Sequence, residues 1–276
     1  MNPRAAVAPI VAAVVVLVAV VGGSSPAAQS DRAGRSVDLV ASAHPSSARP
    51  TVSDVAFDVS KVRGWDVKAD TAALTSTTCD GCAGHSSALH VLYLPRASTA
   101  ALDNVANAWT QGCTDCTGTA LSVQVVVLRG RPATIPNNRA LALNAACTGC
   151  RTAALAFQVV LVADDAMPLT LSEVAELRAW VQQQAFLLNE SVSPPLADPT
   201  ASQTPTASPT PTTGETAKPS PVASPSPTLP TSEVRAVTHD RLRVRRDAVS
   251  ALGELEDLLA HALDAETVSS DVELSR

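Results

Sequence analysis

The chain lacks the sequence features that mark several common functional classes. Its 26 acidic residues outnumber its 20 basic ones, and the net charge of −6 leaves no excess of cations to neutralise phosphates. This balance argues against a dedicated nucleic-acid-binding role. The chain also has no HExxH, no GxSxG and no phosphate-binding glycine loop, and its five histidines are scattered. The motifs therefore indicate no catalytic residue and no cofactor.

One apolar run long enough to engage a membrane is present, between Ala5 and Val21, and small and turn-forming residues follow it. This pattern is typical of a secretory signal cleaved after Ala27. An uncleaved membrane anchor formed by residues 5–21 is the alternative. Since no second apolar span follows, both interpretations predict that the rest of the chain is exported and lies outside the cell or at its surface.

A second change in composition lies between Ser191 and Thr231. These 41 residues include 11 prolines and 16 serines or threonines and no aromatic residue. Such a segment buries too little apolar surface to offset the entropy of ordering it, so we expect a disordered linker. Its serines and threonines are candidates for O-glycosylation, and an unmodified flexible tether is the alternative.

The cysteines come in three CxxC pairs that recur with a period of 34 residues: Cys79, Cys82, Cys113, Cys116, Cys147 and Cys150. The repeat extends beyond the cysteines. His90, Gln124 and Gln158 each lie eleven residues after the first cysteine of their pair, and a valine follows each of them. The pattern therefore indicates a structural repeat.

Each pair precedes a short, valine-rich apolar run, which predicts a strand covered on both faces. The segments after these runs carry helix signals. A helix over 98–112 places four apolar residues on one face: Leu102, Val105, Ala106 and Trp109. Pro136 suits a helix start after the second run, and Thr170 and Glu173 form a capping box after the third.

We therefore predict an α/β fold of three tandem CxxC-strand-helix repeats, which form a small, mainly parallel sheet with helices. Helical crossovers would place all three cysteine pairs at the same end of the sheet. Alternation in residues 53–62 predicts an additional edge strand. The expected organisation is 1–27 signal peptide or anchor, 28–50 flexible segment, 51–190 globular domain, 191–231 linker and 232–276 helical tail.

Three kinds of chemistry fit the cysteine pairs. In an exported protein they favour disulfides, which we expect within each pair, with bonds between neighbouring repeats as the alternative. Two pairs can also make one tetrahedral zinc site, and the first pair has His85 and His90 nearby. Thiol-disulfide catalysis is less favoured, because each pair is expected to open a strand instead of a helix, whose amino-terminal end would lower the thiol pKa.

The repeat also aligns His90, Gln124 and Gln158. In adjacent parallel strands these residues would form a polar row across an otherwise apolar face, where they need hydrogen-bond partners. Bonds among themselves, to helix side chains or to water are favoured over a bound ligand.

Beyond the linker, apolar residues step by threes and fours along an amphipathic helix: Val244, Ala248, Leu252, Leu255, Leu259 and Ala262. The helix is basic at its start and acidic towards its end, so an antiparallel copy would set basic against acidic residues. We hypothesise self-association through this segment; docking onto the globular domain and a separate, unknown cell-envelope partner are the alternatives.

The string "CTGCRTAALAFQVVLV" and the earlier pairs resemble a group of uncharacterised secreted or membrane-associated proteins of actinobacteria. In that group CxxC followed by a strand like "AFQVVLV" recurs. The resemblance covers roughly residues 79–165. It implies export and a repeat, and it adds no catalytic residue. Taken together, the sequence favours a disulfide-stapled structural or binding module at the cell surface, with an extracytoplasmic thiol-disulfide oxidoreductase or zinc-binding protein as the alternative.

Overall fold

The structure is a computed structural model that describes residues 34–163, 168–193 and 231–276, with side chains from residue 243 onward in the last range. Its elements, in chain order, are β1 (Arg35–Ala43), β2 (Thr51–Lys61), β3 (Asp66–Thr77), β4 (Ala83–Leu94), β5 (Thr99–Gln111), β6 (Thr117–Leu128), β7 (Ala133–Ala145), β8 (Arg151–Val162), α1 (Leu171–Val192), α2 (Thr231–Leu263) and β9 (Glu266–Ser275).

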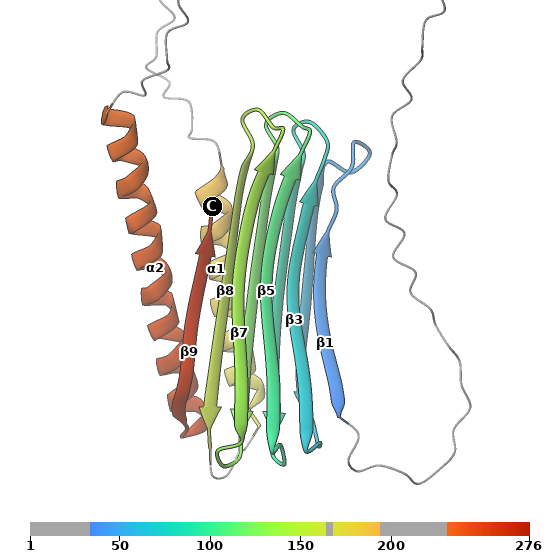
Figure 1. Ribbon diagram of the computed structural model, residues 1–276, viewed down its shortest axis with the longest axis vertical. Helices are drawn as coiled ribbons and strands as arrows, with labels where there is room; N and C mark the ends of the chain where they lie inside the picture. Colours follow the sequence, from blue (N-terminus) through green and yellow to red (C-terminus); the bar gives the residue numbers. More distant parts are fainter. Residues whose placement is uncertain (1–33, 164–167, 194–230) are drawn as a thin grey trace, which may run out of the picture. The chain divides into compact units, whose positions relative to one another are not determined.

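The strands form two sheets, and the chain crosses from one to the other after each of the first seven strands. Sheet I has the order β1-β3-β5-β7 and sheet II the order β2-β4-β6-β8-β9. All neighbours among β1 to β8 are parallel, while β9 runs antiparallel to β8. Figure 1 shows β1, β3, β5 and β7 side by side. Each turn of the chain adds one strand to each sheet, so the fold is a β-solenoid of about four turns.

The expected α/β fold with three CxxC-strand-helix repeats is wrong, because the segments assigned to the first two helices are strands. The residues expected to form a helix over 98–112 lie in β5, where burial alternates residue by residue. Leu102 therefore faces the solenoid interior and Trp109 faces outward. A period of two over the whole segment outweighs the matches to a helical period. The 34-residue period spans two strands and two turns.

Pro136, expected near a helix start, lies inside β7. Strand β7 is an edge strand of sheet I, and proline is tolerated in edge strands because the side without a neighbouring strand needs no backbone N–H. The prediction from residues 53–62 is confirmed, since β2 is one of the two edge strands of sheet II.

The interior between the sheets is layered along the strands. Near the CxxC turns it is filled by alanines, among them Ala73, Ala88, Ala106, Ala120 and Ala154. At the far end leucines and valines pack together, including Leu92, Leu94, Leu102, Val126 and Leu128. A polar row lies between the two layers and is described below.

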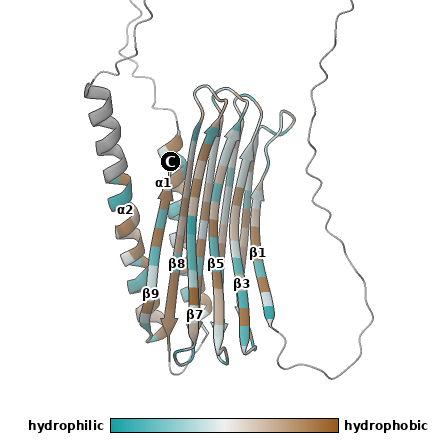
Figure 2. Cartoon of the chain, viewed as in Figure 1, coloured by the Kyte–Doolittle hydropathy of each residue, from teal (hydrophilic) through white to brown (hydrophobic). Residues whose placement is uncertain are grey.

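A larger core lies between the outer face of sheet II and the two helices. It joins Phe157 of β8 to Leu177 and Trp180 of α1 and to Leu255 and Leu259 of α2. The rings of Phe157 and Trp180 meet edge to face with centroids 5.2 Å apart. Because β8 is covered on both faces, it is buried at every position from 152 to 161, as its apolar run predicted, and Figure 2 shows it hydrophobic over most of its length. The described helices leave the outer face of sheet I uncovered.

Helix α1 begins as the sequence predicted. The hydroxyl of Thr170 accepts a hydrogen bond from the Glu173 N–H, and the Glu173 carboxylate accepts one from the Thr170 N–H at 2.6 Å. The hydrogen bonds that the Thr170 N–H and hydroxyl donate to the Glu173 carboxylate lower the pKa of Glu173. The capping box is confirmed.

The carboxy-terminal region differs from a purely helical tail. Helix α2 ends at Leu263, and residues 266–275 form β9, which adds an antiparallel edge to sheet II. Leu255 and Leu259 are fully buried in the core described above. The apolar seam of the helix is therefore used within the chain, which corresponds to the alternative in which the helix docks onto the globular domain.

Several predictions concern residues outside the described ranges. The signal or anchor at 1–27 lies outside them, as do residues 194–230 of the linker. Strand β1 occupies 35–43, within the segment 28–50 for which we expected flexibility, because its backbone pairs with β3. Neither described helix contains a stretch that is long and apolar enough to cross a bilayer.

Candidate functional site

The three CxxC segments form the turns that carry the chain from sheet I to sheet II. A disulfide closes each turn, joining Cys79 to Cys82, Cys113 to Cys116 and Cys147 to Cys150, with Cα–Cα distances of 5.5, 6.2 and 5.8 Å. The turns stack through backbone hydrogen bonds, since the Gly81 N–H donates to the Thr114 carbonyl and the Asp115 N–H to the Thr148 carbonyl, both at 2.8 Å. The cysteine pairs therefore line one edge of the solenoid.

The third residue of every CxxC turn has a left-handed backbone. Its φ is +65° at Gly81, +53° at Asp115 and +69° at Gly149. Glycine adopts this conformation without strain, and aspartate tolerates it better than most residues do. At Gly149 space also matters, because an added Cβ would lie 2.1 Å from a carboxylate oxygen of Asp115. The residue types within the pairs thus specify the turn.

The second and third turns bring their sulfur atoms together. The four Sγ atoms of Cys113, Cys116, Cys147 and Cys150 all lie within 4.8 Å of one another. Each pair lies between two strands, so no helix amino terminus is placed to stabilise a thiolate. The arrangement suits a disulfide or a metal cross-link better than thiol-disulfide catalysis.

The histidines near the first pair do not join it. His85 and His90 lie on opposite faces of β4, because their positions differ by an odd number of residues. His85 contacts the Thr119 hydroxyl at 2.9 Å on the side that faces α1, and Thr119 in turn donates to Asn189 of that helix. Burial lowers the pKa of His85. Within the described chain, no metal-ligand cluster forms around Cys79 and Cys82.

The aligned residues His90, Gln124 and Gln158 do form a row. The register of sheet II pairs His90 with Gln124 and Gln124 with Gln158. The same register adds Asp58 of β2 beside His90 and Asp271 of β9 beside Gln158. The polar row therefore crosses all five strands of sheet II on its inner face and has an aspartate at each end.

The glutamines of the row bond to each other and to sheet I. The Gln158 amide donates to the Gln124 side-chain oxygen at 2.8 Å, and the Gln124 amide donates to the Thr71 hydroxyl at 3.0 Å and the Ala69 carbonyl at 3.1 Å. Gln124 is fully buried. Buried amides need such partners, so these bonds tie the two sheets together at a defined register.

His90 is enclosed between Thr71 and Asp58. Its Nδ1 lies 3.0 Å from the Thr71 hydroxyl, and its Nε2 lies 3.6 Å from a carboxylate oxygen of Asp58. Since Thr71 accepts a hydrogen bond from Gln124, its own proton is available for donation to Nδ1 in the tautomer that carries the ring proton on Nε2. Burial lowers the pKa of His90, and the charge of Asp58 opposes this effect.

Thr71, His90 and Asp58 follow one another in the order hydroxyl, imidazole and carboxylate, as in a catalytic triad, but the contact between His90 and Asp58 is longer than a hydrogen bond. In addition, Thr71 is 1% exposed and His90 is 0% exposed. A surface hollow of about 380 Å³ lies beside Asp58, but its lining does not include Thr71 or His90. Both groups are therefore buried between the two sheets, where they hydrogen-bond to each other.

A second series of hydrogen-bonded polar side chains, which the sequence did not predict, lies beside the polar row. The Ser122 hydroxyl donates to Asn104 at 2.6 Å, the Asn104 amide donates to Asn138 at 2.7 Å, and the Asn138 amide donates to Asp271 at 3.2 Å. Asn104 and Asn138 occur at the same place in consecutive repeats, 34 residues apart. That spacing was the available signal, and the helix prediction for both segments concealed it.

Comparison with protein-family models, curated proteins and solved structures finds no match to this chain. Its function therefore has to be argued from its own residues.

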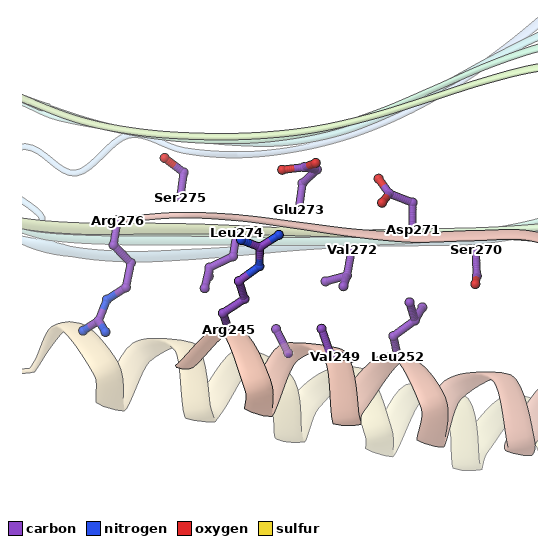
Figure 3. A pocket seen from close by; sticks show the side chains of 11 residues that line it. Arg245, Val249, Leu252, Ser270, Asp271, Val272, Glu273, Leu274, Ser275 and Arg276 are labelled. Carbon is purple, nitrogen blue, oxygen red and sulfur yellow. The ribbon is translucent and has the colours of Figure 1, made fainter. Parts of the chain in front are cut away.

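A groove lies between α2 and β9. Figure 3 shows Val249 and Leu252 of the helix facing Val272 and Leu274 of the strand, while Asp271 and Glu273 point to the other side of the strand. The groove has a volume of about 560 Å³. Its helix and strand walls present no metal-ligating cluster and no nucleophile paired with a base within the described residues. The CxxC turns and the polar row thus remain the features with distinctive chemistry.

Proposed function

We propose that this chain is an exported, disulfide-stapled β-solenoid that serves as a structural or binding module at the cell surface. The observation that carries the proposal is the stack of three disulfides, each closing its own turn. Disulfides form and persist in oxidising compartments and are rare where glutathione and thioredoxin keep thiols reduced. The export signal expected at residues 1–27 agrees with this location.

The interior favours a structural role over an enzymatic one. The histidine and the two glutamines of the polar row are buried between the sheets and bond to sheet I or to each other. These groups set the register of the sheets and are not displayed to a substrate. A solenoid of this kind offers long exposed strands, which suits a module that displays a surface or holds other parts of the chain apart.

Mass spectrometry of the unreduced protein tests the proposal directly. Trypsin cleavage after lysine and arginine places each CxxC pair in a separate peptide, with bounds 69–96, 97–129 and 140–151. We expect each peptide to be about two mass units lighter than its reduced form, because each disulfide removes two hydrogens. Peptides cross-linked to one another would show bonds between repeats and contradict staples within each turn.

The location and the competing enzyme function are tested on protein recovered from the producing cells. We expect the chain outside the cytoplasm, either without residues 1–27 or anchored by residues 5–21. Titration of the native protein with a thiol reagent should find no reactive cysteine. Six free thiols in a cytoplasmic fraction would refute the proposal, and rapidly reacting thiols that reduce a protein disulfide would favour the oxidoreductase.

A further inference from the structure

The sulfur atoms of the second and third turns have the spacing of a metal site. Sγ of Cys113 lies 3.5 Å from Sγ of Cys147 and 3.8 Å from Sγ of Cys150. A tetrahedral zinc site with Zn–S bonds of about 2.3 Å has sulfur-sulfur edges of about 3.8 Å. The two distances between turns therefore already match the edges of such a tetrahedron. The two sulfurs bonded to each other within each turn would have to separate by about 1.7 Å from a bond of about 2.05 Å, and the sulfur of Cys116 already lies within 4.8 Å of both sulfurs of the third turn.

The surroundings of these sulfurs also suit a metal. Cys113 and Cys116 are 4% and 0% exposed, whereas Cys147 and Cys150 are half-buried. The cluster is thus shielded on one side and reachable on the other. Four sulfur ligands without a carboxylate or an imidazole are the donor set that selects zinc over magnesium or calcium.

The first turn is excluded from this cluster. Among the described residues, the group of potential ligands within 4.8 Å of one another contains the second and third pairs and neither Cys79 nor Cys82. The geometry therefore distinguishes pairs that are equivalent in the sequence.

We propose that the second and third turns form a redox-dependent zinc site. A reductant of the dithiol class opens the Cys113–Cys116 and Cys147–Cys150 bonds. Each of these two disulfides gains two electrons and two protons from one molecule of the reductant, which itself becomes a disulfide. The four thiols then bind one Zn²⁺ and release four protons to water. The metal replaces two staples within turns by one cross-link between successive turns of the solenoid. This inference goes beyond the proposed module and does not depend on where the protein works.

The test uses the full chain, reduced with dithiothreitol without oxygen, desalted and titrated with Co²⁺. We expect one Co²⁺ per chain, with the visible absorption of a tetrahedral cobalt thiolate, and full displacement by one equivalent of Zn²⁺. The double variant Cys79→Ser/Cys82→Ser should keep this stoichiometry. The variants Cys113→Ser/Cys116→Ser and Cys147→Ser/Cys150→Ser should each lose the tetrahedral signal.

Circular dichroism distinguishes a reduced chain that is folded but binds no metal from one that is unfolded. A reduced chain that keeps its strand signal but binds no Co²⁺ overturns the proposal. A reduced chain that unfolds and is not refolded by one equivalent of Zn²⁺ overturns it equally. Binding that is lost in the Cys79→Ser/Cys82→Ser variant to the same extent as in the other two would show that the three turns act alike, against the geometry described above. None of these results bears on export or on the disulfides of the untreated protein, which mass spectrometry tests separately.

Discussion

Replacing Gln124 by methionine should destabilise the fold by removing the centre of the polar row. Methionine has a similar length but neither donates to Thr71 nor accepts from Gln158, which are 3.0 Å and 2.8 Å away in the native protein. The Gln158 amide would keep only two carbonyl contacts at 3.4 Å. A buried polar group left without its partner costs about 1–3 kcal/mol.

With the Gln158 amide and the Thr71 hydroxyl both affected, we expect the Gln124→Met variant to lose about 3 kcal/mol of unfolding free energy. For a domain of this size, that corresponds to a fall of about 6–12 °C in Tm. Urea unfolding of the oxidised protein, followed by circular dichroism, measures the loss. Gln183→Met, at an exposed position of α1, is the control and should change stability by less than about 0.5 kcal/mol.

A double-mutant cycle separates the hydrogen bond from general packing. If Gln124 and Gln158 stabilise each other, Gln124→Met combined with Gln158→Met should cost about 1 kcal/mol less than the sum of the single variants, because no unpaired amide remains. Two additive losses, or a single Gln124→Met loss as small as that of the exposed control, would refute the idea that the row holds the sheets together.

Burial lowers the pKa of His90 below its ordinary value of 6.5, so the unfolded chain binds the proton more readily than the folded protein does. The free energy of unfolding should therefore fall as the pH drops below about 6.5, by at most about 1.4 kcal/mol per pH unit from this residue. The His90→Gln variant should show a smaller fall, and a urea midpoint that depends on pH between 7.5 and 5 in the same way in both proteins would contradict a contribution from His90. Ala146 has a φ of +50° and the equivalent Gly112 has +62°, so Ala146→Gly should raise stability by about 0.5–1 kcal/mol and Gly112→Ala should lower it by about 1 kcal/mol, both measured by thermal melting. Leu255→Ala, at a position with 0% exposure, should cost about 2–5 kcal/mol, whereas Val249→Ala, at 55% exposure, should cost less than 1 kcal/mol; equal losses would show that α2 does not pack on the core as described.

Part of the fold could be predicted because it depends on local patterns. The Thr170 and Glu173 capping box starts a helix from four consecutive residues, and the run from 152 to 161 is buried on both faces as its composition indicates. The segment of β5 was misread because Leu102, Val105, Ala106 and Trp109 also match a helical period. Alternation over the whole segment distinguishes a strand from a helix. It is evident only when Ala100, Asn104 and Ala108 are also counted as positions that face inward.

The candidate site, like the fold, could be predicted only in part from the sequence. Equal spacing of His90, Gln124 and Gln158 from their cysteines was enough to predict a row across parallel strands, and the register agrees. Asp58 and Asp271 could not be added from the sequence, since one lies before the repeats and the other belongs to an antiparallel strand more than a hundred residues later. Their membership depends on strand pairing, which no local pattern encodes.

By itself, the sequence determined the period of 34 residues, the position of every CxxC turn and the alignment of His90, Gln124 and Gln158 in one row, because a repeated unit places equivalent residues at equivalent heights along its strands. Only the tertiary structure decided that the chain alternates between two sheets, that α2 packs on its own domain and that four of the six sulfurs come within 4.8 Å of one another. These features depend on distances between residues far apart in the chain, and such distances are set by how the sheets stack and not by spacing along the sequence.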